Sequence, residues 1–232
     1  MCGRFTLTSP VDQIQDLFEV KALPELQARY NIAPTQEVLT LRLTDEGARE
    51  AVMMRWGLVP YWADDLSIGS RMINARAETV QSKSAYRDAF ERRRCLVAAD
   101  GFLEWKKHGK QKQPFLIRMK DHRPFGFAGL WDRWRAADSD EWVISCTILT
   151  TDASELVKPV HDRMPVIVRR EDHEHWLDTG LHKEQLRELL TPYDAAEMEA
   201  VPVSTRVNSV ANDDAACLDP AEVQLELGIE SP

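Results

Sequence analysis

The chain runs Cys95-Leu96-Val97-Ala98-Ala99-Asp100-Gly101-Phe102-Leu103-Glu104-Trp105-Lys106-Lys107 through its middle. Residues 95–99 are apolar without interruption, which predicts a buried strand. Other runs have the same strand-like composition, at 38–43, 115–119, 125–130, 142–149 and 165–168. These runs outnumber the helical segments and do not alternate with them strictly. The prediction is therefore an α+β, β-rich fold rather than a doubly wound sheet.

Four segments carry helical signals. The first follows Ser9-Pro10, an N-cap residue with proline at the first helical position. The second begins at Ser84 and runs into the basic residues 92–94, and the others cover 173–176 and 183–190. The chain has no internal repeat and no Ser/Gly-rich linker. We therefore expect one compact domain over 1–232, with its core at about 2–212 and an acidic C-terminal segment at 213–232.

The bulk composition is that of an ordinary soluble globular protein, with 44% hydrophobic and 29% charged residues in 232. No run of about 18 apolar residues and no N-terminal basic stretch before an apolar core is present, so neither a membrane span nor a secretory signal is expected. The four cysteines are scattered, without a CxxC spacing: Cys2, Cys95, Cys146 and Cys217. A disulfide framework and a zinc site are therefore not expected, and an intracellular, reducing location is.

The formal net charge of −9 argues against non-specific binding to nucleic acid, but the charge is unevenly distributed. From Arg71 to Arg135 there are 16 basic residues against 7 acidic ones. From Glu171 onward there are 15 acidic residues against 3 basic ones. A basic middle beside an acidic end is compatible with a localised site for a polyanion, although solvated faces of both signs would give the same count.

The N-terminus Met1-Cys2-Gly3-Arg4-Phe5 is chemically distinctive. If Met1 is removed, Cys2 carries both a free α-amine and a thiol. Such a 1,2-aminothiol condenses with an aldehyde to a Schiff base, and the thiol then closes onto the imine to give a thiazolidine ring. On these residues alone, an early cysteine without function is the favoured interpretation, and the rest of the chain has to decide.

Three further segments could supply polar chemistry. In an extended chain, the side chains of Asn74, Arg76 and Glu78 share one face. This face could bind a substrate, or it could be the solvent-exposed face of an edge strand. Glu104 lies between Leu103 and Trp105, where an apolar setting would raise the pKa of its carboxyl toward neutrality, or it could be a solvent-facing residue at the end of a strand. His161 opens the run His161-Asp162-Arg163 before an apolar strand and could transfer protons, or the run could be a structural turn.

A binding site for single-stranded nucleic acid needs cations for the phosphates and aromatic rings for the bases. Arg4, Arg76 and Arg163 are the candidate phosphate partners. Trp62 and Trp105 are the candidate stacking or wedging surfaces, whereas most of the other tryptophans are expected in the core.

Six segments, in this order, strongly resemble the SRAP family, the SOS-response-associated "peptidases" that are also described as abasic-site sensors. They are Met1-Cys2-Gly3-Arg4-Phe5, Arg29-Tyr30-Asn31-Ile32-Ala33-Pro34-Thr35, Trp56-Gly57-Leu58-Val59-Pro60, Ile73-Asn74-Ala75-Arg76-Ala77-Glu78-Thr79, Ala99-Asp100-Gly101-Phe102-Leu103-Glu104-Trp105-Lys106 and Val160-His161-Asp162-Arg163-Met164-Pro165. Each segment is weak evidence alone, but the ordered set is specific and the resemblance extends to Asn208. The main departure is Leu103, where family members often have an aromatic residue.

The resemblance implies a β-barrel-like core flanked by short helices, with a positively charged groove for single-stranded DNA. It implies that Met1 is removed and that Cys2 captures the aldehyde of a ring-opened abasic deoxyribose as a thiazolidine crosslink. Asn74 would position Cys2 or the sugar, and Glu104 would assist Schiff-base formation and ring closure. His161 would handle the ring-opening proton and the slow reversal.

For DNA binding, the resemblance implies that Arg4, Arg76 and Arg163 contact backbone phosphates. Asn31, Pro34 and Trp105 would form the wall that faces the DNA. No metal or other cofactor is implied. We expect a monomer in the cytoplasm that associates with the nucleoid when bound to DNA, and strand cleavage by β-elimination is an expected side reaction.

Three other functions stay open on the residues alone. An N-terminal-nucleophile hydrolase is one, since class II glutamine amidotransferases also begin Met-Cys-Gly, although no segment here suggests an oxyanion hole or a glutamine clamp. A cysteine peptidase that pairs Cys2 with His161 is another. The third is a non-catalytic module for single-stranded DNA in which Cys2 is incidental.

Overall fold

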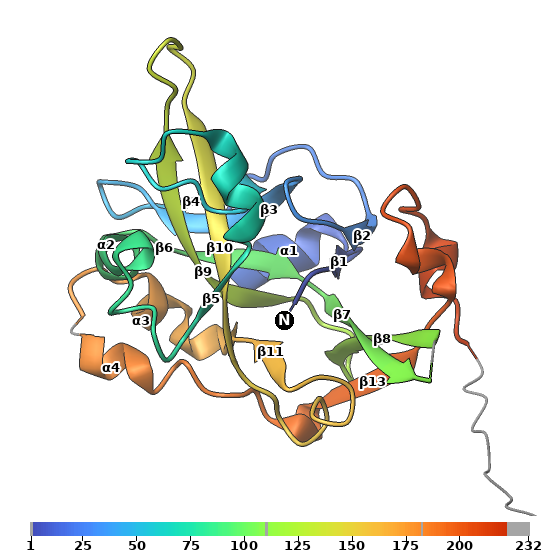
Figure 1. Cartoon of the computed structure of the whole chain (residues 1–232). Coiled ribbons are helices and arrows are strands. Elements are labelled where there is room, and N and C mark those ends of the chain that lie inside the picture. The colour runs from blue at the N-terminus through green and yellow to red at the C-terminus, as the bar shows by residue number, and fades with distance from the viewer. Residues whose placement is uncertain (1, 110, 182, 222–232) are drawn as a thin grey trace, which may run out of the picture.

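The computed structural model describes residues 2–109, 111–181 and 183–221 and contains two β-sheets (Figure 1). In the larger sheet, β9 (Phe125–Trp134) pairs with both β6 (Arg94–Ala99) and β10 (Val143–Asp152). β3 (Glu37–Leu43) and β4 (Arg49–Trp56) complete the circuit between β6 and β10, so five strands close into a barrel. The predicted α+β fold with a barrel-like core and short helices is confirmed.

Three short strands lie beside the barrel. β5 (Asn74–Arg76) and β11 (Arg163–Pro165) both pair with β10, and β12 (Ile167–Val168) pairs with β9. The second sheet has the strand order β13-β8-β7-β1-β2. Its strands are β1 (Phe5–Leu7), β2 (Arg29–Ile32), β7 (Gly101–His108), β8 (Gln111–Met119) and β13 (Met198–Pro202).

Aromatic side chains in the core join the second sheet to the barrel. Phe5 of β1 makes edge-on ring contacts with Trp56 at 5.1 Å and with Phe127 at 5.7 Å between centroids. All three rings are fully buried. Because Phe5 is anchored here, the chain start at Cys2 is held at the junction of the two sheets.

A glycine permits the close packing of β6 against β9. Cys95 stands opposite Gly129, and a Cβ atom built on Gly129 would lie 2.8 Å from the Sγ atom of Cys95. This separation is shorter than any ordinary contact, so a side chain at position 129 would push the two strands apart. All six residues of β6 are buried, as the apolar run 95–99 predicts.

The helices are short. Within the described residues they are α1 (Val11–Phe18), α2 (Ser84–Arg92), α3 (His173–Leu177) and α4 (Lys183–Arg187), with the 3₁₀ segments η1 (Leu66–Arg71), η2 (Arg170–Asp172), η3 (Ala195–Glu197), η4 (Thr205–Asn208) and η5 (Ala215–Leu218). The fourth helix is shorter than the expected 183–190, and residue 94 belongs to β6 rather than to the second helix. No helix of the described ranges has the length and apolar character that crossing a membrane would require.

The predicted N-cap at Ser9 is wrong. The helix begins at Val11, and the N-cap position is held by Pro10. Ser9 instead gives both its backbone N–H, at 2.8 Å, and its hydroxyl, at 3.0 Å, to the carboxylate of Asp100. The same carboxylate accepts hydrogen bonds from Thr6 and Thr8. Asp100 therefore organises the turn between β1 and α1 from the β6–β7 corner.

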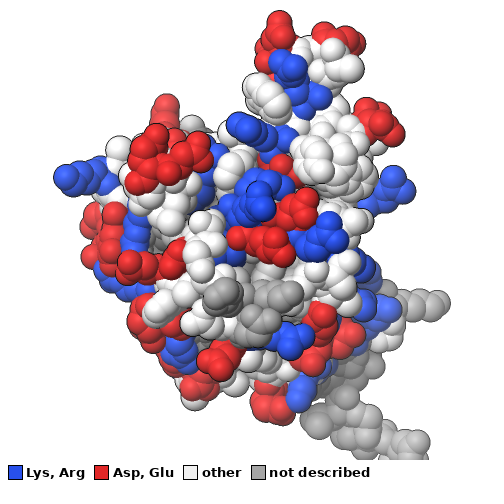
Figure 2. All heavy atoms as spheres, turned by 90° about the vertical axis from the view of Figure 1, so that its left-hand side faces the viewer, with Lys and Arg blue, Asp and Glu red and all other residues white. Residues whose placement is uncertain are grey.

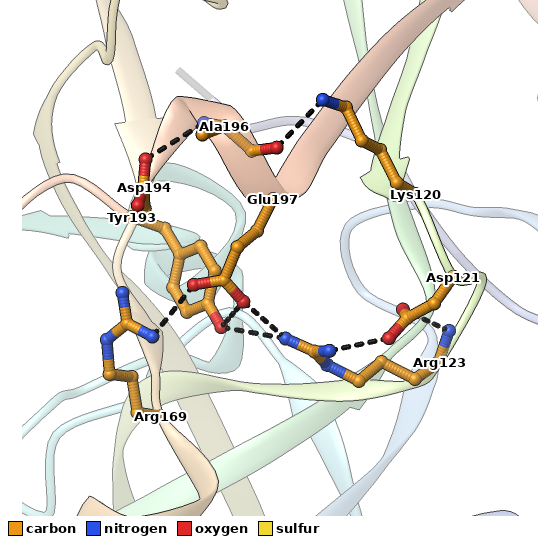
Figure 3. A network of polar contacts seen from close by, with 8 residues as sticks. All are labelled: Lys120, Asp121, Arg123, Arg169, Tyr193, Asp194, Ala196 and Glu197. Atoms are coloured by element: carbon orange, nitrogen blue, oxygen red, sulfur yellow. Dashed lines mark hydrogen bonds and ion pairs between the residues drawn. The ribbon is translucent and has the colours of Figure 1, made fainter.

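The basic middle and the acidic end of the chain lie against each other. Arg118 of β8 pairs with Glu199 of β13 at 2.8 Å, and Arg123 pairs with Glu197 at 2.6 Å. Figure 3 shows Arg123 and Arg169 both directed at Glu197. These ion pairs neutralise part of the uneven charge seen in the sequence, and Figure 2 shows acidic and basic side chains interspersed over one face of the molecule.

Residues 213–221 pack onto the rest of the chain. Cys217 of η5 is fully buried in a small cluster with Leu103 and Val207, and Val203 forms a bridge with Pro220. The expected boundary near residue 212 stays a prediction, and the acidic stretch 222–232 lies outside the described residues.

Candidate active site at the N-terminal cysteine

Cys2 is held in place by its backbone and its thiol. The side-chain amide of Asn74 donates a 2.7 Å hydrogen bond to the carbonyl oxygen of Cys2. The thiol points to the carbonyl oxygen of Arg4 at 3.6 Å, and the same oxygen accepts the backbone N–H of Leu103 at 3.0 Å. Cys2 is therefore fixed between β5 and β7. Met1 lies outside the described residues, so its removal stays a prediction.

The Cys2 thiol is protonated as it stands. It is fully buried, and burial raises its pKa far above the ordinary thiol value. The negative charge of the nearby Glu104 raises this pKa further. Nucleophilic attack by this sulfur therefore requires a group that takes its proton as the bond forms.

Glu104 is suited to that task. It lies on β7 with a side chain that is 4% exposed, and burial raises the pKa of its carboxyl to about 7. The charge of Asp162 raises this pKa as well. A carboxyl with a pKa near the working pH can both accept and release a proton, as general acid–base catalysis needs. The sequence-based expectation of an acid among apolar neighbours agrees with this environment.

Asn74 presents a second polar atom to the site. β5 pairs in parallel with β10, so that Asn74 stands beside Ile148 and Arg76 beside Thr150. The Oδ1 atom of Asn74 is buried and accepts no hydrogen bond from the described part of the chain. Because an orphaned buried oxygen costs free energy, a ligand hydroxyl or ammonium group bound there would satisfy it.

His161 has a defined hydrogen-bonding pattern at one ring nitrogen. Its Nδ1 atom accepts the backbone N–H of Arg163 at 2.9 Å, so in the neutral ring the proton resides on Nε2. The carboxylate of Asp162 also lies 2.9 Å from Nδ1 and would accept a hydrogen bond from the Nδ1–H group of the charged ring. The pKa of His161 is lowered, mainly because the ring is partly buried. His161 can thus change charge on the acid side of neutral pH, with Asp162 as the partner of the charged form.

The three predicted arginines differ sharply in their surroundings. Arg76 is exposed and forms no ion pair within the described residues. Arg4 is partly buried and donates to the Oδ1 atom of Asn31 at 2.7 Å and to the carbonyl of Val207 at 3.0 Å. Arg163 is enclosed by two carboxylates, those of Glu78 and Asp152.

Asn31 is fully buried, and its side chain is occupied by protein partners. Its Oδ1 atom accepts from Arg4, and its amide nitrogen lies 2.7–3.1 Å from three carbonyls of the segment 207–212. The carboxylate of Asp213 accepts the backbone N–H groups of Tyr30 and Asn31. Asn31 therefore fastens this C-terminal segment beside Arg4. Sequence reasoning missed Asp213 and the segment 207–212 because nothing local links them to residue 31.

The candidate aromatic side chains lie in two different parts of the fold, Trp105 on β7 and Trp62 in the loop after β4. Trp105 donates its indole N–H to Asn208 at 2.7 Å and lies 5.8 Å from the guanidinium of Arg4. Trp62 is 49% exposed, next to Tyr61, which is 60% exposed. Pro34 is partly exposed in the turn after β2. Exposed indole and phenol rings can stack on a bound base.

The loop that carries Trp62 is fixed by contacts with η1 and β9. Gly57 has φ +129°, and a Cβ atom there would lie 2.5 Å from the carbonyl oxygen of Gly69. The backbone N–H of Tyr61 donates to the buried carboxylate of Asp132 at 3.1 Å. Trp134 donates its indole N–H to the carbonyl of Ala63 at 2.6 Å. The loop is thus held on both sides of the exposed ring.

No group of three or more His, Cys, Asp or Glu side chains within the described ranges is arranged to hold a metal ion. The chemistry that the site offers comes from Cys2, Asn74, Glu104 and the His161–Asp162 pair.

Comparison with known proteins places the chain in a family. Residues 1–210 match the model of the SOS response associated peptidase (SRAP) family. The abasic site processing protein YoaM of Bacillus subtilis is 43% identical over 224 residues, which cover 94% of this chain and 98% of that protein. The abasic site processing protein YedK of Escherichia coli is 29% identical, with 95% and 100% covered.

The fold has a close counterpart among crystal structures. A protein from Bacteroides thetaiotaomicron superposes with a TM-score of 0.83 at 26% identity, covering 95% of this chain and 100% of that one. A protein from Bordetella bronchiseptica superposes with a TM-score of 0.77 at 28% identity, covering 88% of this chain and 100% of that one. With nearly the whole chain matched in sequence and in fold, the protein belongs to the SOS response associated peptidase family.

Proposed function

We propose that this protein processes abasic sites in single-stranded DNA by capturing them covalently on Cys2. The observation that carries the proposal is the arrangement of the buried Cys2 beside Glu104, whose carboxyl has a pKa of about 7, with Asn74 bound to the Cys2 carbonyl. The names of the relatives YoaM and YedK support the same substrate.

The reaction balances without an oxidant or a cofactor. Hydrolytic loss of Met1 frees the α-amine of Cys2, which attacks the C1′ aldehyde of the ring-opened sugar. The carbinolamine loses its hydroxyl as water and becomes an imine. The sulfur then adds to the imine carbon while the thiol proton passes to the nitrogen, which closes the thiazolidine ring.

The side chains have separate roles in this sequence. Glu104 in its acid form protonates the departing hydroxyl, and its carboxylate form then takes the proton of the Cys2 thiol. His161 transfers the proton at the sugar ring oxygen during ring opening and during reversal. Asn74 holds the Cys2 backbone so that the amine and thiol face the same carbon.

DNA contacts in the proposal come from exposed and half-exposed groups. Arg76 and Arg4 contact phosphates, Trp62 and Trp105 contact bases, and Pro34 lines the wall between them. Asn31 contributes by fixing the segment 207–212 behind Arg4. A monomer in the cytoplasm, bound to the nucleoid at damage sites, is the corresponding cellular expectation.

The imine also explains the expected side reaction. While the imine persists, loss of the 3′ phosphate by β-elimination can cleave the strand. Addition of the thiol consumes the imine, so capture should dominate over cleavage in the wild type.

The decisive experiment uses single-stranded DNA with one abasic site and a denaturing gel. Wild type should give a heat-stable shifted band without reduction, and Cys2→Ala, which keeps the α-amine but lacks the thiol, should give none unless its imine is trapped with borohydride. Cys2→Ser retains the amine but lacks the thiol, so it should give a band only after borohydride reduction, together with more strand cleavage. Absence of any covalent species with processed wild-type protein would exclude the proposal.

The same preparation separates the alternative functions. Release of ammonia from glutamine would indicate an amidotransferase, and cleavage of an unrelated protein would indicate a peptidase. Binding that depends on salt but not on Cys2, with no covalent product, would indicate a passive module for single-stranded DNA.

A further inference from the structure

The segment that follows β13 is folded back onto the second sheet. We call residues 203–221 the C-terminal strap, which contains η4 and η5. Val203 pairs with Pro220 at the base of the strap. Figure 1 shows the strap, in red, beside β2 and β8, and η5 contacts β2 while η4 contacts β8. The strap therefore lies next to Arg4 and Trp105, two of the proposed DNA contacts.

The strap occupies one side of the Arg4 guanidinium. The Nη1 atom of Arg4 donates to the Oδ1 atom of Asn31 at 2.7 Å and to the carbonyl oxygen of Val207 at 3.0 Å, which uses both of its hydrogens. Within the described residues, the Nε and Nη2 atoms have no hydrogen-bond partner. One side of the guanidinium is thus anchored, while the edge formed by Nε and Nη2 can bind a phosphate through two N–H groups.

The strap also occupies the polar edge of Trp105. The indole N–H donates to the side-chain oxygen of Asn208 at 2.7 Å. The guanidinium of Arg4 lies 5.8 Å from the centroid of the same ring. Because its one donor is used, the indole can offer a base its face, and stacking on a face tolerates any base. Two consecutive residues of the strap, 207 and 208, therefore hold the cation and the ring as a pair.

Asp213 attaches the strap to β2, the strand at the edge of the sheet. Its Oδ1 atom accepts the backbone N–H groups of Tyr30 at 2.6 Å and Asn31 at 2.9 Å, and its Oδ2 atom pairs with Arg29. The side-chain amide of Asn31 lies 2.7–3.1 Å from three carbonyl oxygens of the strap. Because hydrogen bonds to a charged group are stronger than those between neutral groups, loss of the Asp213 carboxylate should weaken strap docking more than loss of an exposed ion pair.

We propose that Asp213 is a positioning residue for DNA binding, which docks the C-terminal strap so that Arg4 and Trp105 face the bound strand together. The inference rests on the proposed function, because it concerns how that site holds single-stranded DNA. If the strap is docked for only a fraction of the time, the apparent Kd for DNA rises by the inverse of that fraction. In this scheme Asp213 itself touches no DNA.

The matched pair of variants is Asp213→Ala and Asp214→Ala in the full-length chain. Asp214 is the neighbouring acid on the same strap, and its ion pair with Arg206 is exposed on both sides. The first measurement is the Kd for intact single-stranded DNA, from a titration that also gives the number of binding sites, so that only folded protein is compared. The second is the single-turnover rate of crosslinking at saturating abasic DNA.

We expect Asp213→Ala to raise the Kd about tenfold and to leave the saturated crosslinking rate within about twofold of the wild type, because the strap does not hold Glu104 or His161. Asp214→Ala should match the wild type in both measurements. A Kd for Asp213→Ala equal to that of Asp214→Ala would overturn the proposal. A wild type that binds no single-stranded DNA, or forms no crosslink, would instead overturn the proposed function.

An NMR measurement reports the positioning without DNA. In ¹H–¹⁵N spectra, the indole N–H signal of Trp105, assigned by its absence in Trp105→Phe, should shift in Asp213→Ala and stay in place in Asp214→Ala. An unmoved signal in Asp213→Ala would also overturn the proposal.

If Asp213→Ala does not fold, Asp213→Asn carries the test. The asparagine retains an oxygen for the N–H groups of residues 30 and 31 but loses the ion pair with Arg29. Its Kd should be about threefold above that of the wild type, with a shifted indole signal for Trp105. A Kd equal to that of Asp214→Ala would then overturn the proposal.

Discussion

The side-chain amide of Asn74 donates to the backbone carbonyl of Cys2 across 2.7 Å, so Cys2 is held through its main chain. In the proposed reaction, after removal of Met1, this would leave the amine and the sulfur able to turn toward one electrophilic carbon. It also explains why Asn74 must donate a hydrogen bond rather than accept one. The opposite group, a carboxylate, would face the carbonyl oxygen with repulsion.

Asn74→Asp should therefore slow crosslinking more than Asn74→Ala. Loss of the hydrogen bond in Asn74→Ala should raise the activation free energy of crosslinking by about 1 kcal/mol, which slows the reaction about fivefold. In Asn74→Asp, the repulsion between the carboxylate and the carbonyl oxygen should raise it further. Single-turnover rates at saturating abasic DNA measure both effects. Equal rates for wild type and Asn74→Asp would show that the hydrogen bond has no role, and affinity for intact DNA serves as the control.

Glu104 should give the crosslinking rate a pH dependence. With a pKa of about 7, the carboxylate that accepts the thiol proton is half formed at pH 7, and its population falls to about a tenth of the total by pH 6. The rate of ring closure should rise with pH through this value in the wild type. Glu104→Gln should be slower and lack the transition, while its affinity for DNA changes less than its rate. Retention of the transition in Glu104→Gln would assign it to another group.

The same raised pKa predicts a stability change of defined sign. A carboxyl whose pKa is about 7 in the folded protein and 4.5 in the unfolded chain favours folding in its protonated form. That contribution is complete below pH 4.5 and is lost as the pH rises through 7, to a limit of about 3 kcal/mol. Glu104→Gln should therefore melt close to the wild type at pH 4.5 and above it at pH 8. A lower melting temperature of the variant at pH 8 would contradict this sign.

Much of the fold follows from local patterns. Each predicted strand run overlaps an observed strand, and the run 165–168 overlaps two. A short continuous apolar run that ends at turn residues, such as 95–99 before Asp100-Gly101, is typical of a buried strand. β4 was not predicted, since its sequence alternates charged and apolar residues weakly. The closure of the barrel by pairing of β9 with β10 is a long-range feature that no local pattern contains.

The sequence identified candidate residue types in the site, but it did not show which side chains from distant segments contact them. For Glu104 the sequence left two interpretations open, a buried acid and a solvent-facing one, and the structure shows the buried acid. The confinement of Arg163 could not be anticipated, because Asp152 and Glu78 approach it from other segments. Asn31 was expected on a DNA-facing wall, yet its amide is bound to backbone carbonyls in the segment 207–212, far along the chain.

Arg94 should be important for stability rather than for activity. It is 2% exposed and donates to the carbonyls of Phe90, Glu91, Trp176 and Asp178, at the ends of α2 and α3. Helix C-termini leave carbonyls without partners and carry partial negative charge, which suits a buried cation. Arg94→Met should reduce the free energy of unfolding by about 3 kcal/mol or more, measured by urea denaturation. Arg92→Met, on the exposed end of α2, is the matched control and should change it little.

Trp62 should contribute to DNA binding without contributing to stability. Its ring is 49% exposed, while the loop beneath it is fastened by Asp132 and Trp134. Removing the ring leaves those anchors in place, so Trp62→Ala should melt at the wild-type temperature. Stacking on a base contributes about 1–3 kcal/mol, which corresponds to a decrease of about 5- to 150-fold in affinity for single-stranded DNA. Trp142→Ala, at a similarly exposed tryptophan before β10, is the matched control. Equal affinities for the two variants would remove Trp62 from the DNA interface, whereas a selective decrease at position 62 would place the bound strand over this loop.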